Sequence, residues 1–162
     1  MLQKNISNAE YKQVLDKACE SDDQWLRLIY CTAFSYIELV NSYAKTKKGF
    51  NPLLYETYEY QIDDLKFLAE QVSHHPPISA VIGESPNYKF WGDRKYDTPK
   101  LSLSGLEVRP TGFDNFYLKK WDEHIKVFNC RHICKNLIMG TMYIWHFGDM
   151  TGRNLKTGDK LL

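Results

Sequence analysis

The spacing of apolar residues changes once along this chain of 162 residues, near Leu54, and that change constrains the fold more than any other feature. Before Leu54, apolar side chains recur every three or four residues, which is the period of a helix with one covered face. After Leu54, apolar and polar residues alternate in short runs, which is the period of a strand. The sequence therefore predicts an α+β protein, mostly β, with two helices over about residues 8–47 and a sheet over about residues 54–162.

Both predicted helices begin with a capping pattern. Ser7 with Glu10, and Ser21 with Gln24, match the capping box, in which two side chains bond the free backbone N–H groups at the start of a helix. The second helix also carries an apolar stripe, formed by Leu26, Ile29, Ala33, Ile37 and Val40 and widened by Leu28, Phe34 and Leu39. A helix with so wide a stripe is expected to be largely covered by the rest of the molecule.

The predicted strands are short and follow one another closely. Turn residues separate them, as at Ser85-Pro86-Asn87 and Thr111-Gly112. Such spacing predicts an antiparallel meander that curls into part of an incomplete β-barrel. Leu161-Leu162 resembles the start of another strand, and a sheet that stops there has an unpaired edge. We therefore expect a chain that has been cut short and an edge that is open to self-association.

Composition limits the partners and the location. The formal net charge is +1, so the chain lacks the overall basic field that attracts nucleic acid, and any anion site must be local. No apolar run approaches the roughly 20 residues that span a bilayer. The N-terminus lacks the apolar segment of a secretory signal, and the four cysteines form no familiar disulfide pattern. We expect one cytoplasmic domain with no nucleic-acid partner.

The unusual stretch of the sequence is residues 70–77, Glu-Gln-Val-Ser-His-His-Pro-Pro. In a regular strand, His74 and His75 would point to opposite faces, so the prolines must break the pleat if both rings are to reach one ligand. Paired imidazoles offer hydrogen-bond donors to a phosphate and take up charge near neutral pH. Two surface histidines in a proline turn, without any ligand, are the alternative.

A basic cluster precedes the sheet. Lys45, Lys47 and Lys48 stand just before the turn at Asn51-Pro52. Ammonium groups beside such a turn suit the binding of a phosphate between helix and sheet. Lysines at the C-terminus of a helix are also favoured by the helix dipole without a ligand.

Two hypotheses that involve a metal site are alternatives to phosphate binding. An enzyme could use His74, His75 and Glu70 as a metal site, but the familiar His-Glu-x-x-His spacing is missing. A zinc-bound structural module would instead use Cys130, His132 and Cys134, which share one strand face at a spacing of two. That segment lacks a Cys-x-x-Cys turn, and buried free cysteines are common. We predict no catalytic residue, no metal and no cofactor.

Residues 70–77 are identical to the signature of the oxysterol-binding protein family of lipid-transfer domains. Residues 48–59 resemble that family's Lys-Pro-Phe-Asn-Pro-Leu-Leu-Gly-Glu-Thr motif. Further similarity lies at Phe90-Trp91-Gly92 and at residues 136–140, and it continues to Lys160. The N-terminal residues are most similar to the animal-type branch. The resemblance thus covers nearly the whole chain.

The resemblance implies an incomplete antiparallel β-barrel around a tunnel that holds one lipid, with helices packed at one end. It implies a non-enzymatic protein that binds a sterol or phosphatidylserine and exchanges it for phosphatidylinositol 4-phosphate between membranes. His74, His75 and Lys48 would contact the phosphate, and Asn51 would lie beside the lipid head. The location would be peripheral at organelle membranes, including membrane contact sites. A module that senses phosphoinositide without transfer, or a fragment that lacks lipid exchange, is the alternative.

The sequence departs from the family pattern in several places. Gly49 stands where the family usually has proline, and Tyr55 replaces a glycine. A tyrosine would be strained if that position has a positive φ. The family's lid and the far end of its domain lie outside residues 1–162. We therefore expect the chain to be the N-terminal portion of the domain, without the head-group contacts that the far end supplies.

Overall fold

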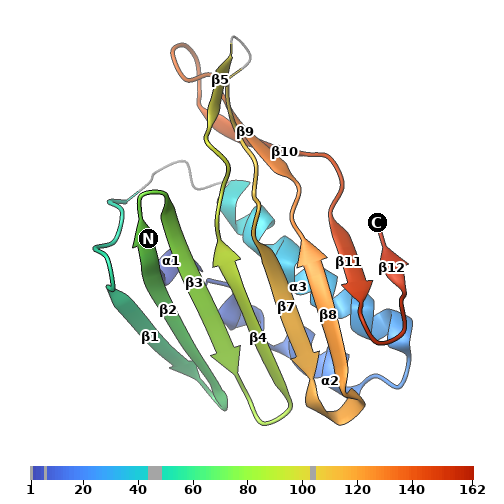
Figure 1. Ribbon diagram of the computed structural model, residues 1–162. Helices are drawn as coiled ribbons and strands as arrows, with labels where there is room; N and C mark the ends of the chain where they lie inside the picture. The colour runs from blue at the N-terminus through green and yellow to red at the C-terminus, as the bar shows by residue number, and fades with distance from the viewer. Residues whose placement is uncertain (1, 6, 44–48, 103–104) are drawn as a thin grey trace.

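The computed structural model describes residues 2–5, 7–43, 49–102 and 105–162, and consists of helices packed against one face of a large antiparallel sheet (Figure 1). A smaller sheet extends from the upper end of the view in Figure 1. The prediction of N-terminal helices followed by antiparallel strands is confirmed. The described strands form part of a barrel wall and do not close into a barrel.

The N-terminal region has more breaks than the two predicted helices. It contains α1 (Leu2–Asn5), a 3₁₀ helix (Ser7–Tyr11), α2 (Gln13–Glu20) and α3 (Gln24–Tyr43). No described helix has the length and apolar character that a membrane span requires.

The predicted capping box at Ser21 is wrong. The N–H of Trp25 donates to Oδ1 of Asp23 at 2.7 Å, so Asp23 caps α3. The N–H of Ser21 bonds the carbonyl of Lys17 and ends α2, while its hydroxyl accepts from the N–H of Asp23. Ser21 therefore belongs to the turn between the helices rather than to the start of α3.

The expectation that α3 is largely covered is also wrong. Its buried side chains are Arg27, Leu28, Cys31, Phe34, Ser35 and Leu39. In contrast, Leu26 and Ile29 are each 41% exposed and Val40 is 54% exposed. The helix α3 contacts α2, the 3₁₀ helix and the strands β8, β10 and β11, and these elements cover its buried side. Much of the predicted stripe therefore faces outward in this chain.

Eight strands form the large sheet, in the order β1-β2-β3-β4-β7-β8-β11-β12. Their bounds are β1 (Thr57–Ile62), β2 (Leu65–His74), β3 (Pro77–Glu84), β4 (Tyr88–Arg94), β7 (Phe113–Leu118), β8 (Glu123–Phe128), β11 (Thr151–Asn154) and β12 (Lys160–Leu161). A 3₁₀ turn (Lys119–Trp121) joins β7 to β8. Adjacent strands are antiparallel, and β1 and the two-residue β12 are the edges.

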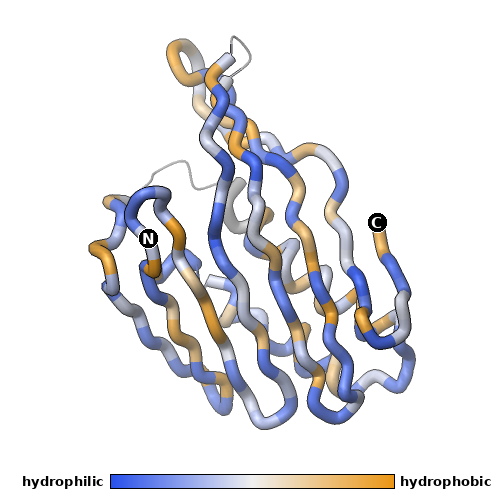
Figure 2. Tube along the Cα trace, in the orientation of Figure 1, coloured by the Kyte–Doolittle hydropathy of each residue, from blue (hydrophilic) through white to orange (hydrophobic). Residues whose placement is uncertain are grey.

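The smaller sheet has the order β10-β9-β6-β5. Its strands are β5 (Lys100–Ser102), β6 (Gly105–Val108), β9 (Arg131–Lys135) and β10 (Tyr143–Phe147). Between β9 and β10 the chain forms an apolar loop, seen as the orange segment at the top of Figure 2. In this loop Ile138 is 96% exposed.

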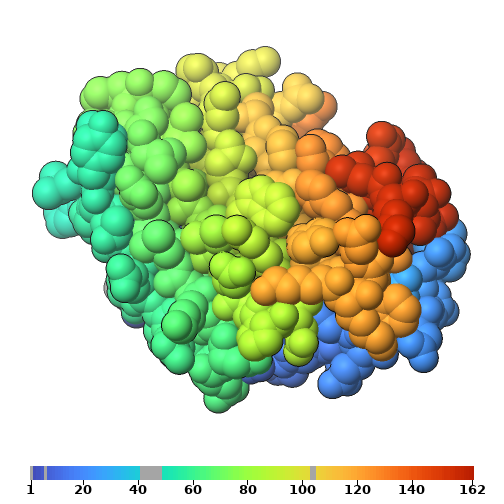
Figure 3. Space-filling model, turned by 60° about the horizontal axis from the view of Figure 1, so that its bottom comes forward, coloured from blue at the N-terminus to red at the C-terminus, as the bar shows by residue number. Residues whose placement is uncertain are grey.

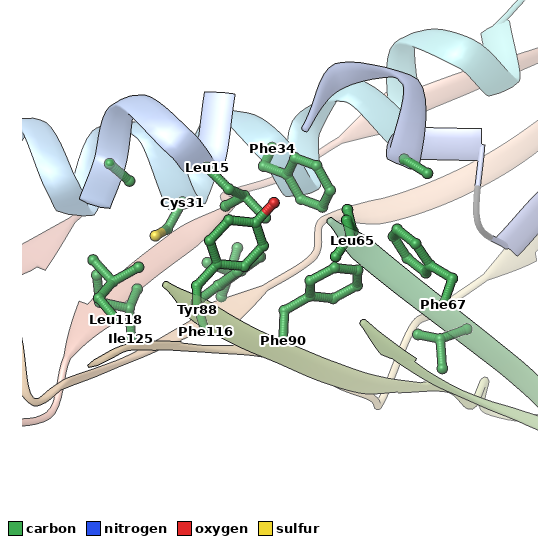
Figure 4. Packing of buried hydrophobic residues seen from close by; sticks show 14 of the residues in the cluster. Leu15, Cys31, Phe34, Leu65, Phe67, Tyr88, Phe90, Phe116, Leu118 and Ile125 are labelled. Carbon is green, nitrogen blue, oxygen red and sulfur yellow. The ribbon is translucent and has the colours of Figure 1, made fainter. Parts of the chain in front are cut away.

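The core lies between the helices and the large sheet (Figure 4). Phe34 of α3 reaches between two strands, and its ring centroid lies 5.4 Å from that of Phe90 and 5.9 Å from that of Phe116. Leu65 and Phe67 extend this core along β2. Alternate residues of β2, β3 and β8 are buried, because successive side chains of a strand point to opposite faces.

Two buried groups of charges join α3 to the sheet. Nε and Nη2 of Arg27 donate to the two carboxylate oxygens of Glu123, at 2.9 and 2.6 Å. Nearer the C-terminal end of α3, Arg94 pairs with Glu38 at 2.8 Å and with Asp114 at 2.7 Å. Both arginines are well buried, so these pairs set the position of the helix against the strands.

Candidate functional site

The two histidines of residues 70–77 lie at the tip of the hairpin formed by β2 and β3. His74 is the last residue of β2 and pairs with Pro77, the first residue of β3, so His75 and Pro76 form the turn. The peptide bond between these two residues is cis. The ring centroids of His74 and His75 are 4.7 Å apart at an interplanar angle of 67°, and both side chains are exposed. The turn thus brings together two rings that a regular strand would separate.

A β-bulge just before the tip changes the direction of the side chains. Gln71 pairs with Ser79 of β3, whereas Ser73 pairs with Ile78, so Val72 is an extra residue in β2. Such a bulge bends a strand and redirects the residues beyond it. Here the residues beyond it include His74.

The side chain of Gln71 stabilises the bulge, a role that was not predicted from the sequence. Its side chain is 1% exposed, its Nε2 donates to the carbonyl of Ser73 at 2.8 Å, and its Oε1 accepts from the hydroxyl of Ser79 at 2.6 Å. The available signal was a polar residue in the apolar register of Leu65, Phe67 and Ala69. A buried amide in such a register needs polar partners, and these two bonds provide them.

The segment that follows the predicted lysine cluster docks beside the bulge. The N–H of Tyr55 donates to the carbonyl of Gln71 at 2.9 Å, and the N–H of Gln71 donates to the carbonyl of Glu56 at 3.0 Å. The carboxylate of Glu56 also accepts from the N–H of Leu53 at 2.9 Å. These bonds fix the segment to the same stretch of β2 that leads into His74.

The predicted site residues thus have different outcomes. His74 and His75 come together at the hairpin tip. Asn51 is exposed on the segment that docks beside β2. Lys48 lies outside the described residues, as do Lys45 and Lys47.

Exposed apolar side chains lie on the docked segment. Phe50 is 99% exposed and Leu53 is 74% exposed, and Leu54 and Tyr55 are exposed as well. Val72, the bulge residue of β2, is also exposed. The histidine tip therefore stands next to an apolar surface that this chain leaves uncovered.

The large sheet has a hollow on the face that points away from the helices (Figure 3). Its volume is about 680 Å³, and it opens to solvent across β2, β3, β4 and β7. Apolar and polar side chains line it together, among them Leu68, Glu70, Ile82, Lys89, Trp91 and Asn115. Glu70 belongs to this lining, and it does not gather with His74 and His75 into a metal-binding group among the residues that the structure describes.

Known structures share this fold. The crystal structure of the Osh1 ORD domain in complex with ergosterol is 30% identical, has a TM-score of 0.89, and aligns with 99% of this chain and 40% of its own. The structure of Osh3 ORD in complex with PI(4)P, from Saccharomyces cerevisiae, is 28% identical with a TM-score of 0.87, over 98% of this chain and 43% of its own. The fold therefore defines the class, which is that of lipid-binding ORD domains.

The sequence comparison gives the family. The model described as Oxysterol-binding protein matches residues 1–162, so this chain belongs to the oxysterol-binding protein family, whose members are non-enzymatic lipid-binding proteins. Oxysterol-binding protein-related protein 6 of Homo sapiens is 39% identical over 162 residues, which are 96% of this chain and 17% of the relative. Oxysterol-binding protein 11 of Dictyostelium discoideum is 36% identical over 165 residues, which are 28% of its length. The chain thus spans less than a third of either protein.

Proposed function

We propose that this chain binds phosphatidylinositol 4-phosphate by its phosphate head and takes part in exchanging it for a sterol or phosphatidylserine between membranes. His74 and His75 donate hydrogen bonds to the phosphate, Lys48 adds an ammonium group, and Asn51 lies beside the lipid head. No covalent bond changes in this function, so it requires no nucleophile or general base.

The observation that carries the proposal is the pair of rings at the hairpin tip. Their centroids are 4.7 Å apart, and both side chains are open to solvent. Two adjacent imidazoles can donate to different oxygens of one phosphate. Buried Gln71 keeps the strand in the bulged form that leads to this tip.

Two further observations favour a lipid over a free phosphate. The exposed side chains of Phe50, Leu53 and Leu54 offer an apolar surface next to the tip, and such surfaces mark contacts with membranes or partners. Solved relatives with the same fold hold ergosterol in one case and PI(4)P in another.

Sensing of phosphoinositide without transfer is the second candidate. Head-group binding needs only the local tip, whereas transfer needs the apolar part of the lipid to be shielded from water at about 25 cal/mol per Å². The described hollow of about 680 Å³ opens to solvent, which favours sensing without transfer. A transfer assay with a fluorescent sterol and donor and acceptor vesicles would separate the two candidates.

The experiment for head-group binding is vesicle flotation. Phosphatidylcholine vesicles that contain either phosphatidylinositol or phosphatidylinositol 4-phosphate are mixed with the parent chain and with the double variant His74→Ala, His75→Ala. We expect the parent to prefer the phosphorylated lipid, and the double variant to bind it roughly tenfold to a hundredfold more weakly, because hydrogen bonds to a charged group contribute about 1.5–3 kcal/mol. Lys66→Ala removes an exposed charge near the other end of β2 and is the matched control.

Two outcomes of this assay would contradict the assignment. Equal binding by parent and double variant, or an equal loss in Lys66→Ala, would show that the histidines are not the phosphate ligands.

A further inference from the structure

Three side chains with metal-binding atoms gather in the smaller sheet, apart from the histidine tip. Cys130 stands just before β9, His132 lies within β9, and His146 lies within β10. Cys130 and His132 share a strand face because they are two residues apart. His146 joins them from the neighbouring strand, where it is the direct partner of His132 in the antiparallel register.

The distances suit a small tetrahedral ion. The Nδ1 atoms of His132 and His146 are 2.7 Å apart, and the potential ligand atoms of all three residues lie within 4.8 Å of one another. A tetrahedral Zn²⁺ with bonds of about 2.0–2.1 Å to nitrogen and 2.3 Å to sulfur requires about 3.3 Å between two nitrogens and about 3.6 Å between nitrogen and sulfur. Small rotations of the two rings, which meet at 88°, would open the pair to that spacing.

The main chain holds both histidine rings in place. His132 bonds the main chain at Arg131, and His146 bonds it at Leu39 of α3. Such outer hydrogen bonds orient metal-binding histidines.

We propose that Cys130, His132 and His146 form a Zn²⁺ site, in which the Cys130 sulfur and the two Nδ1 atoms fill three positions and a water fills the fourth. One thiolate and two imidazoles are a ligand set that suits Zn²⁺, a borderline-soft ion without geometric preference. On binding, the thiol of Cys130 releases its proton to solvent, and the proton that the two Nδ1 atoms share moves to solvent or to Nε2 of the same ring. The ion joins β9 to β10 and, through the main-chain bond of His146, to the C-terminal part of α3.

This site differs from the zinc site that was considered from the sequence. That site used Cys134, which follows His132 at the same spacing of two, but Cys134 does not belong to the described cluster. The third ligand is His146, which lies fourteen residues beyond His132 and is brought to it by strand pairing. The proposed ligand set therefore has His146 in place of Cys134.

The test uses Co²⁺ as a spectroscopic substitute for Zn²⁺. The reduced, metal-free chain is titrated with Co²⁺ and then with Zn²⁺. We expect one equivalent of Co²⁺ to produce the intense visible bands of tetrahedral geometry and a sulfur-to-cobalt charge-transfer band, and Zn²⁺ to displace it. Cys130→Ser should abolish the charge-transfer band, and His146→Asn should lower the affinity at least tenfold.

Two controls keep the result specific. Cys134→Ser removes the next cysteine of the same strand and should leave the titration unchanged, as should the double variant His74→Ala, His75→Ala. X-ray absorption of the parent with one equivalent of Zn²⁺ needs no variant, so it remains decisive if Cys130→Ser does not fold. It should show one sulfur and two imidazole nitrogens. A Zn²⁺ shell without sulfur, no saturable binding, or a charge-transfer band that survives Cys130→Ser would overturn the proposal.

Discussion

Tyr55 has a backbone conformation that suits glycine better than tyrosine. Its φ is 66°, and its side chain is 71% exposed, so packing of the side chain offsets little of the backbone strain. The matching position of the family motif is glycine, so the sequence predicted a strained tyrosine if the backbone there has a positive φ. The structure has this positive φ, and the hydrogen bond from the N–H of Tyr55 to the carbonyl of Gln71 stabilises the conformation.

Replacing Tyr55 with glycine should therefore be tolerated. A non-glycine residue in the left-handed region costs about 1–2 kcal/mol, while glycine costs about 0.5–1 kcal/mol through the entropy of the unfolded chain. We expect Tyr55→Gly to change the free energy of unfolding by between zero and about +1.5 kcal/mol in urea denaturation. Tyr60→Gly, in the middle of β1, is the control and should destabilise the protein by about 1 kcal/mol. A similar loss in both variants would mean that the Tyr55 side chain stabilises the loop.

At the level of elements, the sequence predicted the type of each element well but did not predict which faces pack against one another. Residues 66–70 alternate between polar and apolar, and this predicted the central part of the strand β2, because local spacing alone determines which residues share a face. The exposed face of α3 was not predicted, since Leu26 and Leu28 look alike in sequence and only contact with β8 and β11 decides which is buried. Asp23 was missed as a cap because Ser21 satisfies the same pattern two residues earlier.

The Arg27–Glu123 pair should be a main determinant of how α3 sits on the sheet. Both side chains are buried and bond through two contacts, so removing one partner leaves an unpaired buried charge. We expect Glu123→Ala to lower the free energy of unfolding by about 3–5 kcal/mol. The double variant Arg27→Met, Glu123→Leu should recover most of this loss.

Asp22→Ala provides the control for that pair. Asp22 forms an exposed pair with Lys120, and its loss should cost under about 1 kcal/mol. Chemical denaturation of the four chains measures all of these values. Equal effects of Glu123→Ala and Asp22→Ala would contradict the role given to the buried pair.

Glu38 should make stability depend on pH. Burial raises the pKa of Glu38, Arg94 opposes this, and Asp114 adds to it, since one guanidinium serves two buried carboxylates. A raised pKa means that the folded state holds the proton more tightly than the unfolded state. The contribution to stability is therefore full below the ordinary glutamate pKa and is lost as the pH rises through the raised value.

The variant Glu38→Gln should flatten this dependence. We expect its free energy of unfolding to fall less than that of the parent between pH 4.5 and pH 8, as measured by urea denaturation at a series of pH values. Glu84→Gln, at an exposed position, is the control and should follow the parent. A parent curve that rises over this range would contradict the assigned direction.

At the scale of the whole molecule, the antiparallel meander was predictable but its division into two sheets was not. β4 pairs with β7, while β5 and β6 leave the large sheet to join β9 and β10. This exchange depends on pairs far apart in the sequence, such as Val108 with His132, and no local period reports them. For the same reason, the sequence did not predict that His146 lies beside His132. The histidine tip was predictable because the turn and both histidines are contiguous in the sequence.

The central claim is that His74 and His75 together receive the phosphate of a lipid head. Side-chain NMR of the imidazoles tests it most directly, because the chain has five histidines and the other three serve as internal controls. A water-soluble short-chain phosphatidylinositol 4-phosphate is titrated, with the matching phosphatidylinositol as reference. We predict saturable shifts at His74 and His75 with the phosphorylated lipid alone, and no shift at His124, His132 or His146. Shifts confined to those three residues, or the same response to both lipids, would contradict the claim.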